Sequence, residues 1–407
     1  MDAKKMMQIL EDTAYVRLTG TPEVTKAAKY IQDQCAQMGL KATLEPFEVE
    51  LATIKKAQLF ADGVELPCKG YFLAGSGEVE APLYYLRSME DYNLAKCKGK
   101  IVLVDCYMDY WVYQDLLKNG AVGFITYDGN PYYADSDIDQ RELRPFVSRG
   151  VKIPGVHVNA KTAVALARMG EPMLKIVLEQ DEYKGEAHNV VLDMPGEIDE
   201  YIVLSAHYDS IAISVGVYDN MSGAVGLLAV AEHFANHPHR YGLRFVWTGA
   251  EEQGENGSKA YCKAHEDELS KFALNINLDM IGCIMGKFIA CVTAEENLVN
   301  YLKYMGLEYG MPIHAYQDTY YSDSTSFADK GVPALSLARI APNNTAPIHN
   351  RYDAMDIMKA EQLEADIDFI TFFTDRMVNA ACCPVGREIP ENVKEMLDYY
   401  YSRKRKK

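Results

Sequence analysis

The sequence lacks the surplus of basic residues that a nucleic-acid-binding protein needs. Its 407 residues carry a formal net charge of −17, whereas phosphate recognition requires a positively charged surface. The one dense group of basic residues, at 403–407, follows a tyrosine-rich helical segment, and we expect it to be a solvated tail. Nucleic acid is therefore not an expected partner.

Long apolar runs are also missing. No run approaches the ~20 residues of a membrane-spanning helix, and residues 1–12 have neither the apolar core nor the cleavage site of a signal peptide. The nine cysteines include no Cys-x-x-Cys pair, which is typical of buried, reduced thiols. Asn-x-Ser/Thr triplets at Asn220, Asn256 and Asn343 lie beside candidate site residues, where glycans would obstruct access. These features predict a cytoplasmic protein without a membrane partner.

The chain is long enough for two domains, or for one large domain with an insertion. Residues 1–51 begin with a segment, 22–38, whose apolar residues recur at helical spacing. Residues 52–183 are short apolar runs separated by Gly and Pro, without a cluster of acids and histidines, and from 184 onward strands alternate with helices. Such alternation favours a mostly parallel sheet. We therefore predict an α/β domain with a mostly parallel central sheet flanked by helices, made of 1–51 and 184–407, and a β-rich inserted domain at 52–183.

Acidic and histidine residues follow the apolar runs of the last region. Glu251 and Glu252 stand side by side after the run 243–247, and adjacent side chains at the end of a strand point in opposite directions. One can then bind a metal ion while the other reaches the reacting water. Further candidates at strand exits or helix starts are His207, Asp209, Asp219, Asp279 and His349. Two imidazoles and three carboxylates as ligands, with one spare carboxylate, form the inventory of a hydrolase with two zinc ions.

Each of these signals has an ordinary alternative explanation. His207 and Asp209 face the same way on an extended chain, so that Asp209 can fix the imidazole geometry, but such triplets are commonly polar loops. An adjacent acidic pair is also favoured by the dipole at a helix N-terminus. His349 can be a loop histidine, or a ligand whose second ring nitrogen donates to Asp353. A metal site is favoured because five such signals occur together, each at the end of a strand or the start of a helix. They are His207 with Asp209, Asp219, Glu251 with Glu252, Asp279, and His349.

This order of motifs resembles the co-catalytic zinc aminopeptidases, the family that includes bacterial leucyl aminopeptidases and aminopeptidase Y. The resemblance covers about 186–385 and the opening helix. The segment 52–183 is similar to a protease-associated domain through residues 99–104 and 120–123. The matching motifs are His207-Tyr208-Asp209, Asp219-Asn220-Met221-Ser222-Gly223, Glu251-Glu252, Asn277-Leu278-Asp279-Met280-Ile281-Gly282 and His349.

The resemblance implies two zinc ions per chain. The ligands it implies are Asp219, shared by both ions, His207 and Asp279 on one ion, and Glu252 and His349 on the other. Glu251 would be the general base, which takes a proton from the attacking water and returns it to the leaving amine. Asp209 would support the catalytic arrangement from behind the histidine.

Two departures from the family pattern concern the residues around the substrate. The family commonly has Ser-Asp-His-x-x-Phe before the last ligand, whereas residues 322–327 read Ser-Asp-Ser-Thr-Ser-Phe. Some relatives have a tyrosine directly before the final histidine, where this chain has Ile348. A donor to the oxyanion must then come from elsewhere, and Tyr320 and Tyr321 are the candidates for this substrate-binding role.

We therefore expect a di-zinc metallo-exopeptidase, an aminopeptidase that removes N-terminal residues from short peptides. A carboxypeptidase or dipeptidase on the same scaffold is an alternative, and so is a single-zinc enzyme similar to glutaminyl cyclases. A non-catalytic, receptor-like relative is disfavoured, because such proteins lose ligands that this chain retains.

Overall fold

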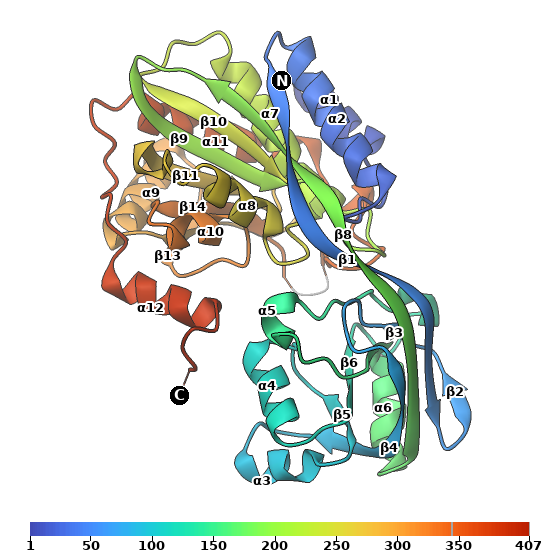
Figure 1. Ribbon diagram of the computed structural model, residues 1–407. Coiled ribbons are helices and arrows are strands. Elements are labelled where there is room, and N and C mark those ends of the chain that lie inside the picture. Colours follow the sequence, from blue (N-terminus) through green and yellow to red (C-terminus); the bar gives the residue numbers. More distant parts are fainter. Residues whose placement is uncertain (343–344, 407) are drawn as a thin grey trace. The chain divides into compact units, whose positions relative to one another are not determined.

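The computed structural model describes residues 1–342 and 345–406, so Asn343 and Asn344 of the third Asn-x-Thr triplet lie outside the described residues. The chain divides into two units, one formed by 1–48 with 186–407 and the other by 49–185. The predicted insertion, 52–183, falls within the second unit. Strands β1 (Ala42–Ala61) and β8 (Met173–Met194) run from one unit into the other (Figure 1).

The first unit is built around a sheet with the strand order β13-β12-β14-β11-β9-β10-β8. The four strands β14, β11, β9 and β10 are parallel, whereas β12 pairs antiparallel with β14, and β8 with β10. The central strands are buried on both faces, as parallel strands usually are. The further strands of this sheet are β9 (Ile198–His207), β10 (Tyr241–Thr248), β11 (Phe272–Leu278), β12 (Lys287–Thr293), β13 (Ile313–Gln317) and β14 (Ala334–Ile340). The predicted α/β fold class is confirmed.

Helices cover both faces of this sheet (Figure 1). The helix predicted at 22–38 is present, because Pro22 suits the first helical position and Val24, Ile31 and Cys35 recur on its buried face. One face carries α1 (Ala3–Asp12), α2 (Pro22–Gln37), α7 (Ser222–Phe234), α9 (Glu296–Tyr309) and α11 (Ala360–Val378). The opposite face carries α8 (Asn256–Ala264), α10 (Ser324–Asp329) and α12 (Glu391–Tyr400).

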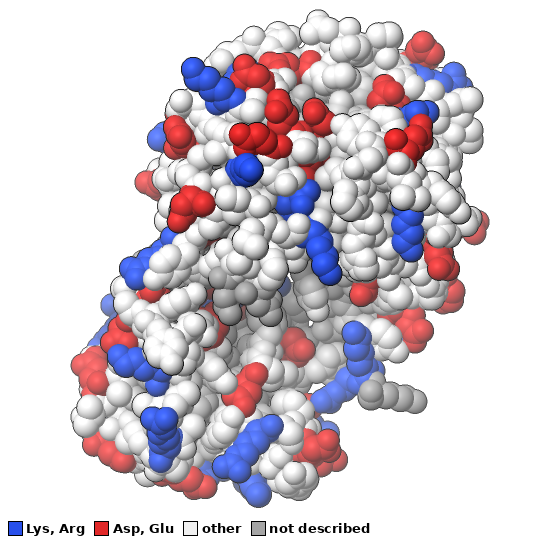
Figure 2. Space-filling model, turned by 180° about the vertical axis from the view of Figure 1, so that it is seen from behind, with Lys and Arg blue, Asp and Glu red and all other residues white. Residues whose placement is uncertain are grey.

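The basic tail begins with anchored side chains. Both terminal nitrogens of Arg403 pair with the carboxylate of Asp329 on α10, at 2.6 and 2.7 Å. Lys404 Nζ lies 2.9 Å from an oxygen of Asp398. Both side chains are still about half exposed, so these two residues are solvated, as expected of the tail, while they take part in surface ion pairs. On the face shown in Figure 2, Lys and Arg side chains of the described residues are scattered among Asp and Glu rather than gathered in one patch.

The second unit has a sheet with the order β4-β5-β6-β7-β3, in which β4 to β7 are parallel and β3 is antiparallel. Apolar clusters lie on both faces of this sheet, so the unit has its own core. Helices alternate with the parallel strands, which makes the unit more α/β in character than the predicted β-rich domain. Its elements are β2 (Val64–Leu66), β3 (Lys69–Gly70), β4 (Gly77–Leu86), β5 (Ile101–Val104), β6 (Gly123–Asp128), β7 (Gly155–Asn159), α3 (Asp91–Leu94), α4 (Tyr110–Lys118), α5 (Pro145–Ser148) and α6 (Ala160–Met169).

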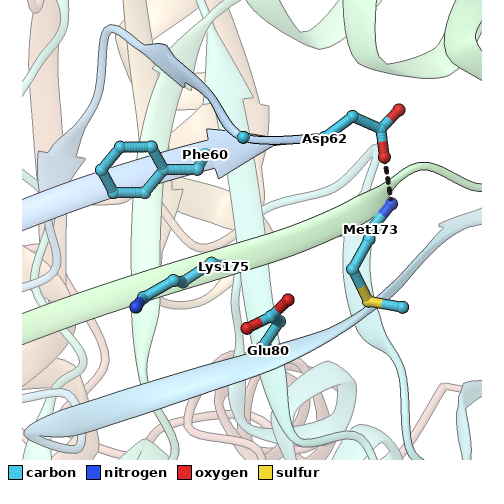
Figure 3. Close-up of a pocket in the computed structure, with 6 residues that line it drawn as sticks. Phe60, Asp62, Glu80, Met173 and Lys175 are labelled. Carbon is cyan, nitrogen blue, oxygen red and sulfur yellow. Dashed lines mark hydrogen bonds between the residues drawn. The ribbon is translucent and has the colours of Figure 1, made fainter.

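A hollow of about 350 Å³ lies on the second unit, lined by Phe60, Asp62, Gly63, Glu80, Met173 and Lys175 (Figure 3). The Met173 amide donates to the Asp62 carboxylate at 2.9 Å, and Lys175 pairs with Glu78 at 2.6 Å. Because its lining offers neither a histidine nor a nucleophile, the hollow is not a candidate catalytic site.

No helix within residues 1–342 and 345–406 is long and apolar enough to cross a membrane. The nine cysteines are all free thiols.

Candidate metal centre

Acidic and imidazole groups from five segments meet at the carboxyl edge of the sheet in the first unit, where open α/β sheets bind their ligands. The segments are the ends of β9, β10 and β11, the short helical turn η3 (Val217–Met221) before α7, and the loop after β14. They carry, in that order, His207, Glu251 with Glu252, Asp279, Asp219 and His349.

Asp219 is shared by two groups of candidate ligands. Its Oδ1 lies 3.1 Å from His207 Nε2, and its Oδ2 lies 3.3 Å from His349 Nε2. Asp279 Oδ1 lies 3.7 Å from His207 Nε2, and Glu252 Oε2 lies 3.2 Å from His349 Nε2. In each group one potential ligand atom per residue lies within 4.8 Å of the others. The structure thus brings together all five residues predicted as metal ligands.

This donor set fits zinc, which binds imidazole nitrogen and carboxylate oxygen. Asp279 Oδ1 is buried and has no hydrogen-bond partner among the described residues. Burying several carboxylates together is unfavourable unless positive charge compensates them. Divalent cations held by these residues would supply that charge. The side chain of His349 is 36% exposed, so this side of the centre is open to solvent.

Glu251 lies beside the centre but belongs to neither group. It is 9% exposed, and its Oε2 lies 3.9 Å from His207 Nε2. Burial raises its pKa well above the usual value; His207 opposes this shift, and the carboxylate of Glu252 adds to it. A carboxylate that lies beside the centre and is not needed as a ligand is free to accept a proton and return it.

Asp209 is fully buried behind His207 and the acidic pair. His207 Nδ1 lies 3.5 Å from Asp209 Oδ1, which is longer than an ordinary hydrogen bond. The two carboxylate oxygens of Asp209 accept hydrogen bonds from the backbone amides of Glu251 and Glu252, at 3.1 and 3.2 Å. Asp209 therefore fixes the backbone of the acidic pair, which the His-x-Asp spacing did not predict.

The contact predicted between Asp353 and His349 is corrected by the structure. Asp353 Oδ1 accepts the amide of Tyr218 at 2.7 Å, and its Oδ2 accepts the amide of Asp219 at 3.0 Å. Burial raises the pKa of Asp353 to about 7, and the negative charge of Asp219 adds to this shift. Asp353 thus supports the shared ligand Asp219, because both of its oxygens are directed at η3.

The two candidate tyrosines face different environments. The hydroxyl of Tyr320 is buried without a hydrogen-bond partner among the described residues. Burial, and then the charge of Asp279, raise its pKa well above the usual value, so it keeps its proton for donation. Tyr321 is 83% exposed, and its ring lies 5.1 Å from that of Tyr400 between centroids. Tyr320 is therefore the better placed of the two to donate to an oxyanion, and the substrate-binding role of Tyr321 stays a prediction.

Sequence reasoning missed Arg17. Its guanidinium is fully buried and donates to the carbonyl oxygens of Tyr208, Val215 and Gly216, at 2.6, 2.5 and 2.7 Å. Burial lowers its pKa to about 10, so it stays charged at neutral pH, and the nearby carboxylate of Asp353 favours that charge. Arg17 therefore ties the N-terminal segment to the loops behind the centre. A single arginine between two helices gave no sequence signal for this role.

Asn220 ties the loop of Asp219 to the loop of Asp279. Its Nδ2 donates to the Leu278 carbonyl at 2.8 Å, and its Oδ1 accepts the amides of Gly223 and Met280, each at 3.0 Å. A Cβ at Gly223 would lie 2.4 Å from the Leu278 oxygen, so glycine is required there. The Asp-Asn-x-Ser-Gly motif thus fixes two ligand loops at once.

Comparisons with known proteins give relatives in sequence and in fold. Residues 189–372 match the sequence model of Peptidase family M28. The aminopeptidase YwaD of Bacillus subtilis (strain 168) is 27% identical over 82% of this chain and 70% of its own length. The probable lipoprotein aminopeptidase LpqL of Mycobacterium tuberculosis is 26% identical over 68% of this chain, which spans only 57% of that relative. The solved structure of BSAP, a zinc aminopeptidase from Bacillus subtilis, shares the fold with a TM-score of 0.78 and 21% identity, over 96% of this chain and 99% of BSAP. By this match, and with the motifs assembled at one edge of the sheet, residues 189–372 are similar to peptidase family M28.

Proposed function

We propose that this protein is a zinc aminopeptidase with two zinc ions per chain. The observation that carries the proposal is the shared position of Asp219 between two ligand groups, with Glu251 beside them and outside both. One group would hold one ion through His207 and Asp279, and the other would hold the second ion through Glu252 and His349.

The chemistry follows from the positions of the protein's own groups. Bound zinc supplies Lewis acidity to the carbonyl of the scissile peptide bond. Glu251 accepts a proton from the attacking water and returns it to the leaving amine. Asp209 keeps the backbone of Glu251 in place through its amide. Tyr320 offers a buried hydroxyl to the oxygen on which negative charge develops.

The choice of an aminopeptidase over a carboxypeptidase is supported by the relatives, since both YwaD and LpqL bear that name. Free peptides with an unblocked N-terminus are therefore the proposed substrates. The exposed side of His349 leaves one face of the centre accessible to them.

The proposal is tested by zinc analysis together with a screen of peptides. We expect two zinc ions per chain and release of the N-terminal residue from free peptides, with no cleavage of N-acetylated ones. Peptides with a blocked C-terminus should be cleaved at the same rate as peptides with a free C-terminus. One zinc ion with cyclisation of N-terminal glutamine, or release of the C-terminal residue, would contradict the proposal.

A further inference from the structure

Helix α12 lies outside the segment 189–372 that matches the family, yet it packs against α10 and contacts the turn that carries Glu251 and Glu252 through Tyr400. Its Val393 and Leu397 are buried in one apolar cluster with Phe327 of α10. The chain just beyond the helix is fixed by the double ion pair between Arg403 and Asp329. The end of α12 is therefore held in a defined place in the first unit.

The segment that carries Glu251 and Glu252 is a tight turn with an unusual backbone. Ala250 and Glu255 both have φ near +54°, in the left-handed region that residues other than glycine seldom adopt. Within the turn, the amides of Gly254 and Glu255 each donate to the Glu251 carbonyl at 2.7 Å. Such a conformation persists only where surrounding contacts hold it.

The turn is held from outside at both ends. At its start, Asp209 accepts the amides of the acidic pair. At its end, the Glu255 side chain is 7% exposed and has two partners. Lys259 Nζ lies 2.9 Å from one carboxylate oxygen, and the hydroxyl of Tyr400, at the end of α12, donates to the other.

We propose that Tyr400 is a positioning residue for the reaction, which acts through Glu255 to fix the turn that presents Glu251 to the metal centre. This inference rests on the proposed function, because it concerns the residue to which that function assigns proton transfer. Without the hydroxyl, the buried carboxylate of Glu255 loses a hydrogen-bond donor. The left-handed end of the turn then keeps only the contact with Lys259. Helix α12 thereby helps to fix the position of Glu251 through the contact between Tyr400 and Glu255.

The test compares Tyr400→Phe with Tyr399→Phe in the full-length, zinc-loaded protein. Tyr399 is the matched control, because its hydroxyl donates to Glu395 on the exposed side of the same helix, at 2.9 Å. Tyr400→Phe keeps the ring beside Tyr321 and removes only the hydrogen bond. We expect its kcat to fall roughly tenfold, within the ~100-fold that a small misplacement far from the chemistry can cost. We expect KM to change by less than about twofold, since uniform substrate binding is untouched.

Two further measurements separate positioning from general structure. Hydrogen exchange at the amides of Gly254 and Glu255 should be faster in Tyr400→Phe than in Tyr399→Phe, at unchanged zinc content. In a double-mutant cycle, adding Tyr400→Phe to Glu255→Gln should lower kcat no further, because both act through one contact.

An unchanged kcat in Tyr400→Phe, unchanged exchange in the turn, or additive effects in the cycle would each overturn the assignment of Tyr400. A wild-type protein that binds zinc and cleaves no peptide would instead refute the proposed function. In that case the exchange measurement still decides whether Tyr400 holds the turn.

Discussion

Glu251→Gln is the substitution that tests the division of roles in the acidic pair. The change keeps the size and polarity of the side chain and removes its ability to accept a proton. Glu251 lies outside both ligand groups, whereas Glu252 Oε2 lies 3.2 Å from His349 Nε2 in one of them. The main chain of the turn is held by Asp209 through backbone amides, so the substitution leaves that support intact.

The expected magnitude follows from the loss of a general base. Such a loss typically lowers the rate by about 10²–10⁴, which corresponds to about 2.7–5.4 kcal/mol of transition-state stabilisation at ~1.36 kcal/mol per factor of ten. The fall should appear in kcat and in kcat/KM equally, because proton transfer contributes to the transition state alone. Zinc content should be the same as in the wild type.

The assay is steady-state hydrolysis of an amino-acyl p-nitroanilide, with zinc measured in the same samples by elemental analysis. Glu252→Gln is the matched control, because it makes the same chemical change one residue further along and should release zinc. Activity above one tenth of the wild type in Glu251→Gln would show that Glu251 is not the base. Zinc loss in Glu251→Gln with retention in Glu252→Gln would show that the two roles are exchanged.

Three further predictions concern the metal and the second unit. Asp219→Ala should lose at least one zinc ion and all detectable activity, because its two oxygens face both histidines of the centre; two retained zinc ions in elemental analysis would contradict the shared position. Chelation should abolish activity, and added zinc should restore it and raise Tm, because the ions bind the folded state; a calorimetric scan without such a shift would argue against the site. Asp128→Asn should lower the free energy of unfolding by roughly 1–2 kcal/mol at pH 7, discounted for partial exposure. Burial raises the pKa of Asp128, but His157 and Arg141 outweigh it and hold the pKa below the usual value. This contribution is present above the unfolded pKa of ~3.9 and is lost as the pH falls further. Denaturant unfolding at pH 7 and below pH 4 measures it, with Asp181→Asn, in an exposed ion pair, as the control. An equal loss in both variants would refute the role of the partly buried contacts of Asp128 with His157 and Arg141.

Periodicity in the sequence was sufficient for the elements with a strong buried pattern. In α11 (Ala360–Val378), the buried Leu363, Ile370 and Met377 recur every seven residues, a spacing that indicates a helix from the sequence alone. The strand β13 was not predicted, because it lies at the sheet edge and buries only Ala315. An edge strand shows neither the alternation nor the continuous apolar run from which strands are recognised.

For the site, the sequence by itself determined which residue types stand at the exits of the strands. His207, Asp279 and the pair Glu251-Glu252 could be identified because parallel strands carry their carboxyl ends to one edge. The chemistry of imidazole and carboxylate then restricted the metal and the class of reaction.

Only the tertiary structure decided which of these groups touch one another and what supports them. Asp353 reaches the amide of Asp219 across 134 residues of sequence, and Tyr400 reaches Glu255 across 145. Tyr320 and Tyr321 are neighbours in the chain, yet one hydroxyl is buried and the other side chain is exposed. Local spacing fixes the direction of a side chain only within its own strand or helix, whereas contacts between loops depend on how the sheet and its helices pack together.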